Sequence, residues 1–243
     1  MTELSLPGGN VNSVVRVGDT VRRPPSSAFT RELLGLFERH GWRGSPRFMG
    51  VDELGREILS FVDGHVAWDD EQPPDVTSDQ SLAAVAELVR EFHDLTAGTA
   101  MAGEHEVVCH NDLSPKNTVY RDLGMGLRPV AIIDWDIAAP GARIHDVAHV
   151  CWQYVGLGPS VSDVASAARR VRLICDAYGL TDRSLLLETI LWWQDRCWRG
   201  IEAAAEAGVP AMIRLRERGA ARSVRDAYQW VAAQREALQS TLR

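Results

Sequence analysis

HNDLSPKN, residues 110–117, and IIDWD, residues 132–136, decide how the rest of this sequence is interpreted. Each motif follows or completes a short apolar segment, Val107–Cys109 in the first case and Val130–Ile133 in the second, and such segments are typical of buried strands. A carboxylate at the end of a buried strand is held rigidly. The two motifs therefore predict a set of fixed polar side chains at strand ends.

These side chains match the needs of phosphoryl transfer from ATP, which requires a base, Mg²⁺ ligands, a cation on the phosphates and a covering loop. Asp112 is the candidate base. Asn117 follows five residues later, and this spacing lets a short loop place both side chains on one side. Asp134 offers a hard oxygen ligand that suits Mg²⁺. Asp136 would face the same way if the strand continued, although a turn is expected there.

A simpler interpretation is that Asp112 and Asn117 only cap a turn, as Asp and Asn often do. The second motif argues against it, because it places Asp134 between an expected strand and a loop. Structural context of this kind is what confirms a motif. The catalytic interpretation is therefore favoured.

The chain has 243 residues, enough for one large core or two small lobes. Residues 1–62 are rich in expected strands and residues 63–243 are mostly helical. In the first part the pattern predicts a helix over Ser27–His40, with Ser26 or Ser27 as its cap, and strands at Leu4–Leu6, Val14–Val17, Thr20–Arg23, Arg47–Val51 and Glu57–Val62. Two hairpins are expected among these strands, with turns at Gly18-Asp19 and Asp52–Gly55. In the second part it predicts strands only before the two motifs, and helices over Ser81–Leu95, Ile144–Tyr154, Ser162–Ala177, Ser184–Ala207 and Ser223–Leu242.

The two motifs, followed by Asp146-Val147-Ala148, resemble the aminoglycoside phosphotransferase family within the wider protein-kinase-like fold. The resemblance implies an α+β fold with a small β-rich N-lobe, residues 1–62, and a larger α-helical C-lobe, residues 63–243. It implies ATP and Mg²⁺ as cofactors, Asp112 as the catalytic base, and Asn117 and Asp134 as metal ligands. It also implies that His110 is a structural loop residue and that Asp146 braces the catalytic loop from the next helix.

The expected N-lobe departs from the kinase pattern, in which a strand Lys holds the phosphates and pairs with a helix Glu. Arg22 is the first choice for this cation and Arg23 the second, because no lysine lies nearby. Only one of them should serve, since neighbours on a strand point to opposite faces. Glu32 is the best available partner, although an exposed helix carboxylate is nearly as good an interpretation. Gly8–Asn10 is either a nucleotide-covering loop or a plain turn.

Two further regions are candidate ligand contacts. Ser60-Phe61-Val62 is similar to the family's hinge, where the Ser60 carbonyl and the Val62 N–H would contact adenine; the alternative is an edge strand before a turn. In the acceptor pocket, Trp192 and Asp195 would suit an amino sugar, although helical tryptophans are more often core residues. Lys116 in the catalytic loop would contact phosphate or substrate.

Composition limits the partners. The net charge of −7 and the lack of a basic run argue against nucleic-acid binding. An acidic surface could attract a cationic acceptor, although solubility is the commoner meaning of such a charge. No apolar run is long enough for a membrane helix, and no signal peptide is visible. The four cysteines form no CxxC pair and are expected to be reduced thiols of a cytoplasmic protein.

The expected function is transfer of the ATP γ-phosphate to a hydroxyl of a small molecule, an aminoglycoside-like amino sugar or another cationic acceptor. Choline, homoserine, fructosamine and methylthioribose are alternative acceptors that the sequence does not separate. A nucleotide-binding pseudokinase is the alternative of a different class, supported by the missing strand lysine. The C-terminal end lacks the acidic, aromatic stretch of some aminoglycoside 3′-kinases, which weakens a specific link to antibiotic resistance.

Overall fold

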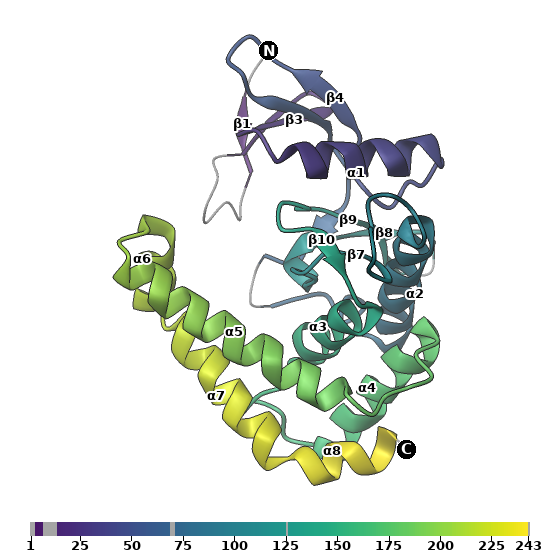
Figure 1. The fold of residues 1–243 in the computed structure, drawn as a ribbon, viewed down its shortest axis with the longest axis vertical. Coiled ribbons are helices and arrows are strands. Elements are labelled where there is room, and N and C mark those ends of the chain that lie inside the picture. Colours follow the sequence, from purple (N-terminus) through teal and green to yellow (C-terminus); the bar gives the residue numbers. More distant parts are fainter. Residues whose placement is uncertain (1–2, 7–13, 69–70, 125, 243) are drawn as a thin grey trace. The chain divides into compact units, whose positions relative to one another are not determined.

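The computed structural model describes residues 3–6, 14–68, 71–124 and 126–242, with the elements shown in Figure 1. The chain divides into two compact units, residues 1–146 and 147–243. The lobe boundary expected at residue 62 falls inside the first of these units and stays a prediction. The candidate covering loop, Gly8–Asn10, lies outside the described residues.

The first unit begins with a five-stranded antiparallel sheet in the order β1-β2-β3-β5-β4. Both expected hairpins are confirmed, and each turns at a glycine with a positive φ, Gly18 at 59° and Gly55 at 76°, where a side chain would be strained. The strands are β1 (Leu4–Ser5), β2 (Val15–Val17), β3 (Thr20–Arg23), β4 (Phe48–Val51) and β5 (Glu57–Ser60).

Helix α1 (Ala28–Arg39) forms where the helical period was expected. The Ser27 hydroxyl accepts a hydrogen bond from the Thr30 N–H at 3.0 Å, and Gly41 follows the end of the helix with a φ of 68°. Phe37 lies on the buried face of α1 and packs edge-to-face on Trp135, with ring centroids 5.0 Å apart. This aromatic contact connects α1 to the segment that contains Asp134.

The rest of the first unit consists of α2 (Asp79–Thr96) and short strands. A three-stranded antiparallel sheet has the order β6-β8-β9, and β7 pairs with β10. These strands are β6 (His65–Val66), β7 (Val107–Cys109), β8 (Thr118–Asp122), β9 (Leu127–Ile132) and β10 (Ala139–Gly141). The expectation of only two strands here was wrong, because β6 and β10 are too short to show a period and β8 has consecutive buried residues in place of alternation.

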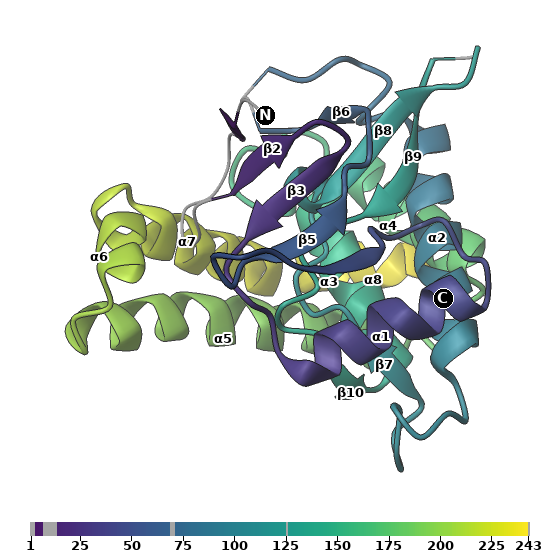
Figure 2. The same cartoon turned by 90° about the horizontal axis from the view of Figure 1, so that it is seen from above.

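The second unit is helical. Its elements are the end of α3 (Arg143–Val155), α4 (Val164–Tyr178), α5 (Leu186–Glu206), α6 (Pro210–Glu217), α7 (Ala220–Ala233) and α8 (Arg235–Leu242). Helix α5 packs along α6 and α7, and α4 packs on α8 (Figures 1 and 2). The single helix expected over 223–242 is two helices that meet at Gln234, and α6 was missed because its arginines hide the apolar period.

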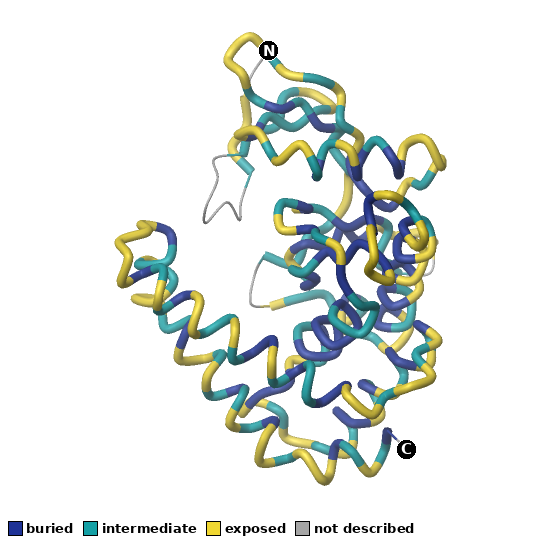
Figure 3. The backbone as a smooth tube through the Cα atoms, viewed as in Figure 1, coloured by how far each residue is buried: buried dark blue, intermediate teal, exposed yellow. Residues whose placement is uncertain are grey.

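Burial follows this arrangement within each unit. Strand β7 is buried throughout and α2 has a broad buried face (Figure 3). Helices α6 and α7 are mostly exposed or half-buried and have a narrower buried face, as amphipathic surface helices do. Among the described residues, none of the helices combines the length and the low polarity that crossing a bilayer demands.

Substitution of Gly64 tests how closely the backbone packs against Tyr120 of β8 in the first unit. Its φ is 151°, and a Cβ there would lie 2.5 Å from the Tyr120 carbonyl oxygen. Because backbone atoms cannot yield, Gly64→Ala should lower the free energy of unfolding by about 1–3 kcal/mol in urea denaturation. The matched control is Gly200→Ala, which meets nothing within 4 Å on helix α5 and should be neutral or stabilising by up to about 1 kcal/mol. Equal losses in both variants would contradict this reading of the packing.

Candidate active site

Asp146 holds the loop that follows β7. Its Oδ2 accepts the backbone N–H of His110 at 2.7 Å, and its Oδ1 accepts the backbone N–H of Asn111 at 2.9 Å. Asn111 has a φ of 66°, a left-handed conformation that costs a non-glycine residue about 1–3 kcal/mol and persists only where its surroundings impose it. The two hydrogen bonds from successive N–H groups impose it here.

His93, on α2, is a third donor to Asp146. Its Nε2 lies 3.1 Å from Asp146 Oδ2, and both side chains are fully buried. Burial lowers the pKa of His93, so the neutral imidazole with its proton on Nε2 is the form that donates to the carboxylate. Burial opposes ionisation of Asp146, but the converging donors outweigh it and its pKa is lowered. The buried aspartate is therefore ionised and its oxygens are occupied.

Asp112 and Asn117 meet directly. The Asn117 Nδ2 donates to Asp112 Oδ2 at 2.9 Å and to the Asp112 carbonyl at 2.8 Å. Asn117 is 3% exposed, at the end of the short 3₁₀ turn Pro115–Asn117. Since its amide nitrogen is used twice, the amide oxygen is the atom left for another partner. This is the geometry that a base and a metal ligand on one loop require.

Asp134 is held beside this loop through its neighbour Ile133. The Ile133 N–H donates to the Asn117 carbonyl at 2.9 Å, and His110 Nε2 lies 3.0 Å from the Ile133 carbonyl. His110 Nδ1 accepts the Asp112 N–H at 3.2 Å, so Nε2 carries the proton and donates to Ile133. Asp134 itself has a φ of 66°. Asp112, Asn117 and Asp134 thus belong to one connected backbone network.

Negative charge collects at this point. Partial burial, the carboxylate of Asp136 and, more weakly, that of Asp112 raise the pKa of Asp134, although 51% of its side-chain surface remains accessible. Asp136 Oδ1 is buried and has no hydrogen-bond partner in the described part of the chain. Crowded carboxylate and amide oxygens are the ligands that Mg²⁺ prefers. The residues present therefore fit a divalent cation held by Asn117 and Asp134, with Asp136 close by.

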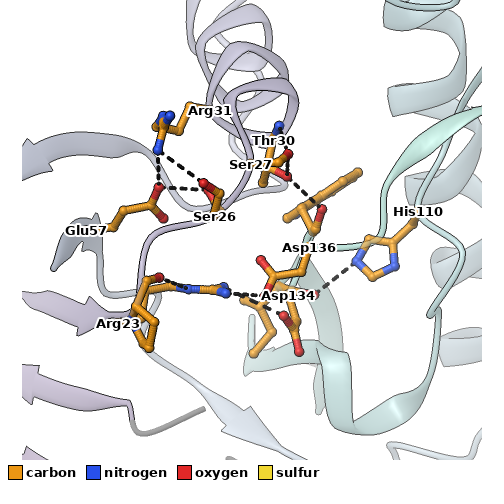
Figure 4. A network of polar contacts seen from close by, with 12 residues as sticks. Arg23, Ser26, Ser27, Thr30, Arg31, Glu57, His110, Asp134 and Asp136 are labelled. Atoms are coloured by element: carbon orange, nitrogen blue, oxygen red, sulfur yellow. Dashed lines mark hydrogen bonds and ion pairs between the residues drawn. The ribbon is translucent and has the colours of Figure 1, made fainter. Parts of the chain in front are cut away.

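Arg23 is the arginine that reaches this cluster. Figure 4 shows its guanidinium extending from β3 toward Asp134 and Asp136. Arg23 Nη2 forms an ion pair with Asp136 Oδ2, and Nη1 lies 3.7 Å from Asp134 Oδ1. Arg22 points elsewhere, with Nη1 2.6 Å from Thr20 Oγ1 and Nε 3.7 Å from Asp52. Of the two expected cations, the structure brings Arg23 and not Arg22 to the candidate metal ligands.

The expected partner of this cation, Glu32, is exposed on α1 and forms none of the ion pairs within the described residues. The ion pair that connects the helix to the sheet instead has its cation on the helix and its carboxylate on a strand. Arg31 Nη1 donates to Glu57 Oε1 of β5 at 3.2 Å, and the Ser26 hydroxyl donates to the same oxygen at 2.8 Å (Figure 4). The sequence missed this pair because Glu57 lies in a different strand from Arg22 and Arg23.

The remaining candidate contacts are placed as follows. The Val62 N–H forms no backbone hydrogen bond within the described residues, and the Ser60 hydroxyl accepts the Arg47 N–H at 2.8 Å. Lys116 is exposed on the 3₁₀ turn. On α5, Trp192 is 45% exposed and Asp195 bonds to Arg199 at 2.8 Å. Their roles in ligand binding stay predictions.

Comparisons with known proteins agree with this geometry. The model of the phosphotransferase enzyme family (APH) matches residues 79–184, which include both motifs and Asp146. The trifolitoxin immunity protein of Rhizobium leguminosarum bv. trifolii is 32% identical over 208 residues, covering 74% of this chain and 75% of the relative. An identity and coverage of this size show that the two chains belong to one family.

Solved structures show the same fold. APH(2″)-IIIa in complex with GDP and kanamycin superposes with a TM-score of 0.56 at 17% identity, covering 91% of this chain and 93% of that one. A choline/ethanolamine kinase family protein from Mesorhizobium loti superposes with a TM-score of 0.52 at 16% identity, covering 98% and 88%. The α+β protein-kinase-like fold expected from the motifs is thus confirmed.

The chain belongs to the phosphotransferase enzyme family that includes the aminoglycoside phosphotransferases. Membership of this family makes it a phosphotransferase.

The His93–Asp146 pair predicts a pH dependence of stability. Because burial depresses the pKa of His93, this side chain is protonated in the unfolded chain below about pH 6.5 while it stays neutral in the folded chain. Stability should therefore be full above that pH and fall as the pH drops toward the folded pKa, by up to about 1.4 kcal/mol per pH unit. His93→Gln should reduce this slope, measured by urea denaturation at several pH values. His105→Gln, at an exposed position, should leave it unchanged; an unchanged slope in His93→Gln would refute the assignment.

Proposed function

We propose that this protein is a cytoplasmic, ATP- and Mg²⁺-dependent kinase that transfers the γ-phosphate to a hydroxyl of a small cationic molecule. The observation that supports this most directly is the hydrogen bond of 2.9 Å from Asn117 Nδ2 to Asp112 Oδ2. It orients a carboxylate as a base while the amide oxygen of the same side chain stays available beside Asp134. A pseudokinase would have no need to keep this combination.

Asp112 would accept the proton of the attacking hydroxyl as the new oxygen–phosphorus bond forms, while the bond between the γ-phosphorus and the bridging oxygen breaks and ADP leaves. Asn117 Nδ2 holds the carboxylate directly through its bond to Oδ2. The Asp112 backbone is held by the bond from Asn117 Nδ2 to its carbonyl and by the bond from its N–H to His110 Nδ1. Mg²⁺, when bound, would supply positive charge that offsets the charge of the phosphates. Asn117 and Asp134 are the residues that would hold it, and Arg23 would contact the phosphates that lie next to it.

Adenine binding at the hinge is part of the same proposal. In this arrangement the Val62 N–H, which has no backbone partner among the described residues, donates to the ring, and the Ser60 carbonyl accepts from the amino group. Recognition through the backbone explains why the side chains there need no special chemistry.

A cationic acceptor is supported by the chain's acidity and by its structural relatives. The net charge of −7 favours positively charged ligands over anionic ones in the encounter step. The relatives include a kanamycin complex and a choline/ethanolamine kinase family protein, and these ligand classes share positively charged nitrogen. An amino sugar of the aminoglycoside type is the leading acceptor, and an amino alcohol is the second candidate.

The catalytic assignment predicts the effect of Asp112→Asn. Loss of the base should lower kcat by about 10²–10⁴-fold while the affinity for Mg²⁺-ATP stays within about threefold. Activity is measured by ADP release over a panel of kanamycin, gentamicin, choline and ethanolamine, with glycerol as the neutral comparison. The control is Asp19→Asn, whose carboxylate is fully exposed on a hairpin and should change neither quantity. Full activity of Asp112→Asn on an acceptor that the parent phosphorylates would rule out the assignment.

The two arginines of β3 provide a matched pair of variants. Arg23→Gln should raise the KM for Mg²⁺-ATP by about 10–100-fold, because a hydrogen bond to a charged group contributes about 1.5–3 kcal/mol. Arg22→Gln removes the same charge one residue away and should raise this KM by less than about threefold. A larger effect of Arg22→Gln than of Arg23→Gln would show that the phosphates lie on the other face of the strand.

A further inference from the structure

A surface cavity in the second unit lies outside everything assigned so far. It has a volume of about 420 Å³ and is formed by the end of α5, the end of α6 and the first turns of α7. Four arginines and two glutamates are among the residues that line it: Glu202, Arg216, Glu217, Arg218, Arg222 and Arg225. The chain around it therefore carries a local excess of positive charge in a protein whose net charge is −7.

The positive charge of this cavity is only partly compensated. Glu202 is already paired with Arg216, at 3.8 Å. Arg222 and Arg225 form no ion pair within the part of the chain that the structure describes. Guanidinium groups only donate hydrogen bonds. Two adjacent, unpaired guanidiniums on one helix repel each other unless an anion lies between them.

Trp198 adds an independent sign of a missing partner. This side chain lines the cavity, and its indole Nε1 is buried without a hydrogen-bond acceptor among the described residues. An unsatisfied buried donor costs about 1–3 kcal/mol, and such groups are few in native proteins. Because the indole N–H can only donate, the partner that it lacks among the described residues is a hydrogen-bond acceptor.

Gln194 extends the same pattern inward. It lies four residues before Trp198, so both side chains are on one face of α5. Gln194 is 0% exposed, and neither its amide oxygen nor its amide nitrogen has a partner within the described residues. The face of α5 that includes Trp198 thus contains two side chains, one helical turn apart, whose polar atoms lack hydrogen-bond partners among the described residues.

The start of α7 contributes backbone donors. Gly219 is the cap residue, with a φ of 82°, and it has no side chain with which to satisfy the first N–H groups of the helix. The unsatisfied N–H groups at the start of a 14-residue helix give it a partial positive charge that favours anions. Indole, guanidinium and backbone donors thus all contribute to one cavity.

We propose that this cavity binds the phosphate or carboxylate group of a small molecule. The anion would accept the Trp198 N–H and lie against Arg222 and Arg225 at the start of α7. A cationic ligand is excluded by the arginines, so this site differs in charge from the acceptor site proposed above and does not depend on it. A volume of about 420 Å³ matches a small metabolite rather than a macromolecular surface.

The indole resonance of Trp198 in an ¹H–¹⁵N spectrum reports directly on this site, and its loss in Trp198→Phe identifies it. The full chain is titrated with inorganic phosphate and, separately, with succinate, at ionic strength held constant with NaCl. We expect a saturable shift of the Trp198 resonance with at least one of the two anions. A shift with phosphate alone identifies a phosphate ligand, and a shift with succinate alone identifies a carboxylate ligand.

The double variant Arg222→Gln/Arg225→Gln should weaken the binding at least tenfold. The control, Arg169→Gln/Arg172→Gln on α4, removes the same charge from side chains that are 64% and 52% exposed and should leave the affinity unchanged. The proposal is overturned if neither anion shifts the resonance saturably, or if both double variants weaken binding equally, which would mean general attraction to positive charge. Because the readout is binding, its outcome is separate from that of the kinase assays.

Discussion

The geometry of the catalytic loop depends on one carboxylate, that of Asp146. It accepts two successive backbone N–H groups, those of His110 and Asn111, and a third hydrogen bond from His93. A buried aspartate is stable as an anion only when such donors surround it, and its place in the first turn of α3 adds the favourable helix dipole. The strained backbone of Asn111 is therefore a consequence of this interaction. The conformation of Asn111 in turn sets the orientation of the next residue, Asp112.

The same network reaches the second carboxylate through the backbone of Ile133. Its N–H and its carbonyl are both bonded to the catalytic loop, through Asn117 and His110. Asp112, Asn117 and Asp134 thus form one rigid piece of backbone before any ligand binds. Arg23 differs from them, because it reaches the cluster from β3 only through its side chain. We expect the proposed base and metal ligands to be preorganised, and the proposed phosphate-binding side chain of Arg23 to adjust when the nucleotide enters.

The sequence predicted the parts of this arrangement that depend on local chemistry. Glycine turns gave both hairpins, the Ser27 cap gave α1, and the spacing of the two motifs gave Asp112, Asn117 and Asp134 as neighbours. It ranked Arg22 above Arg23, whereas the structure brings Arg23 to Asp134, because the strand register decides which face of β3 lies toward Asp134. His93 was missed because a histidine on the apolar face of a helix looks like an ordinary core residue; only the fold places it against Asp146.

The anchoring of α1 has a consequence for how the nucleotide site is organised. In protein kinases the strand Lys pairs with the helix Glu, so that movement of the helix controls the phosphate-binding cation. Here the helix supplies Arg31, and the buried Glu57, 1% exposed, is its partner in the sheet. Breaking this pair would leave a buried charge without compensation, which is costly, so α1 is held firmly. Arg23 is engaged with Asp136 and Asp134 instead. If Arg23 contacts the phosphates as proposed, anchoring of the helix and contact with the phosphates belong to different residues, and a shift of α1 would not by itself remove Arg23 from the site.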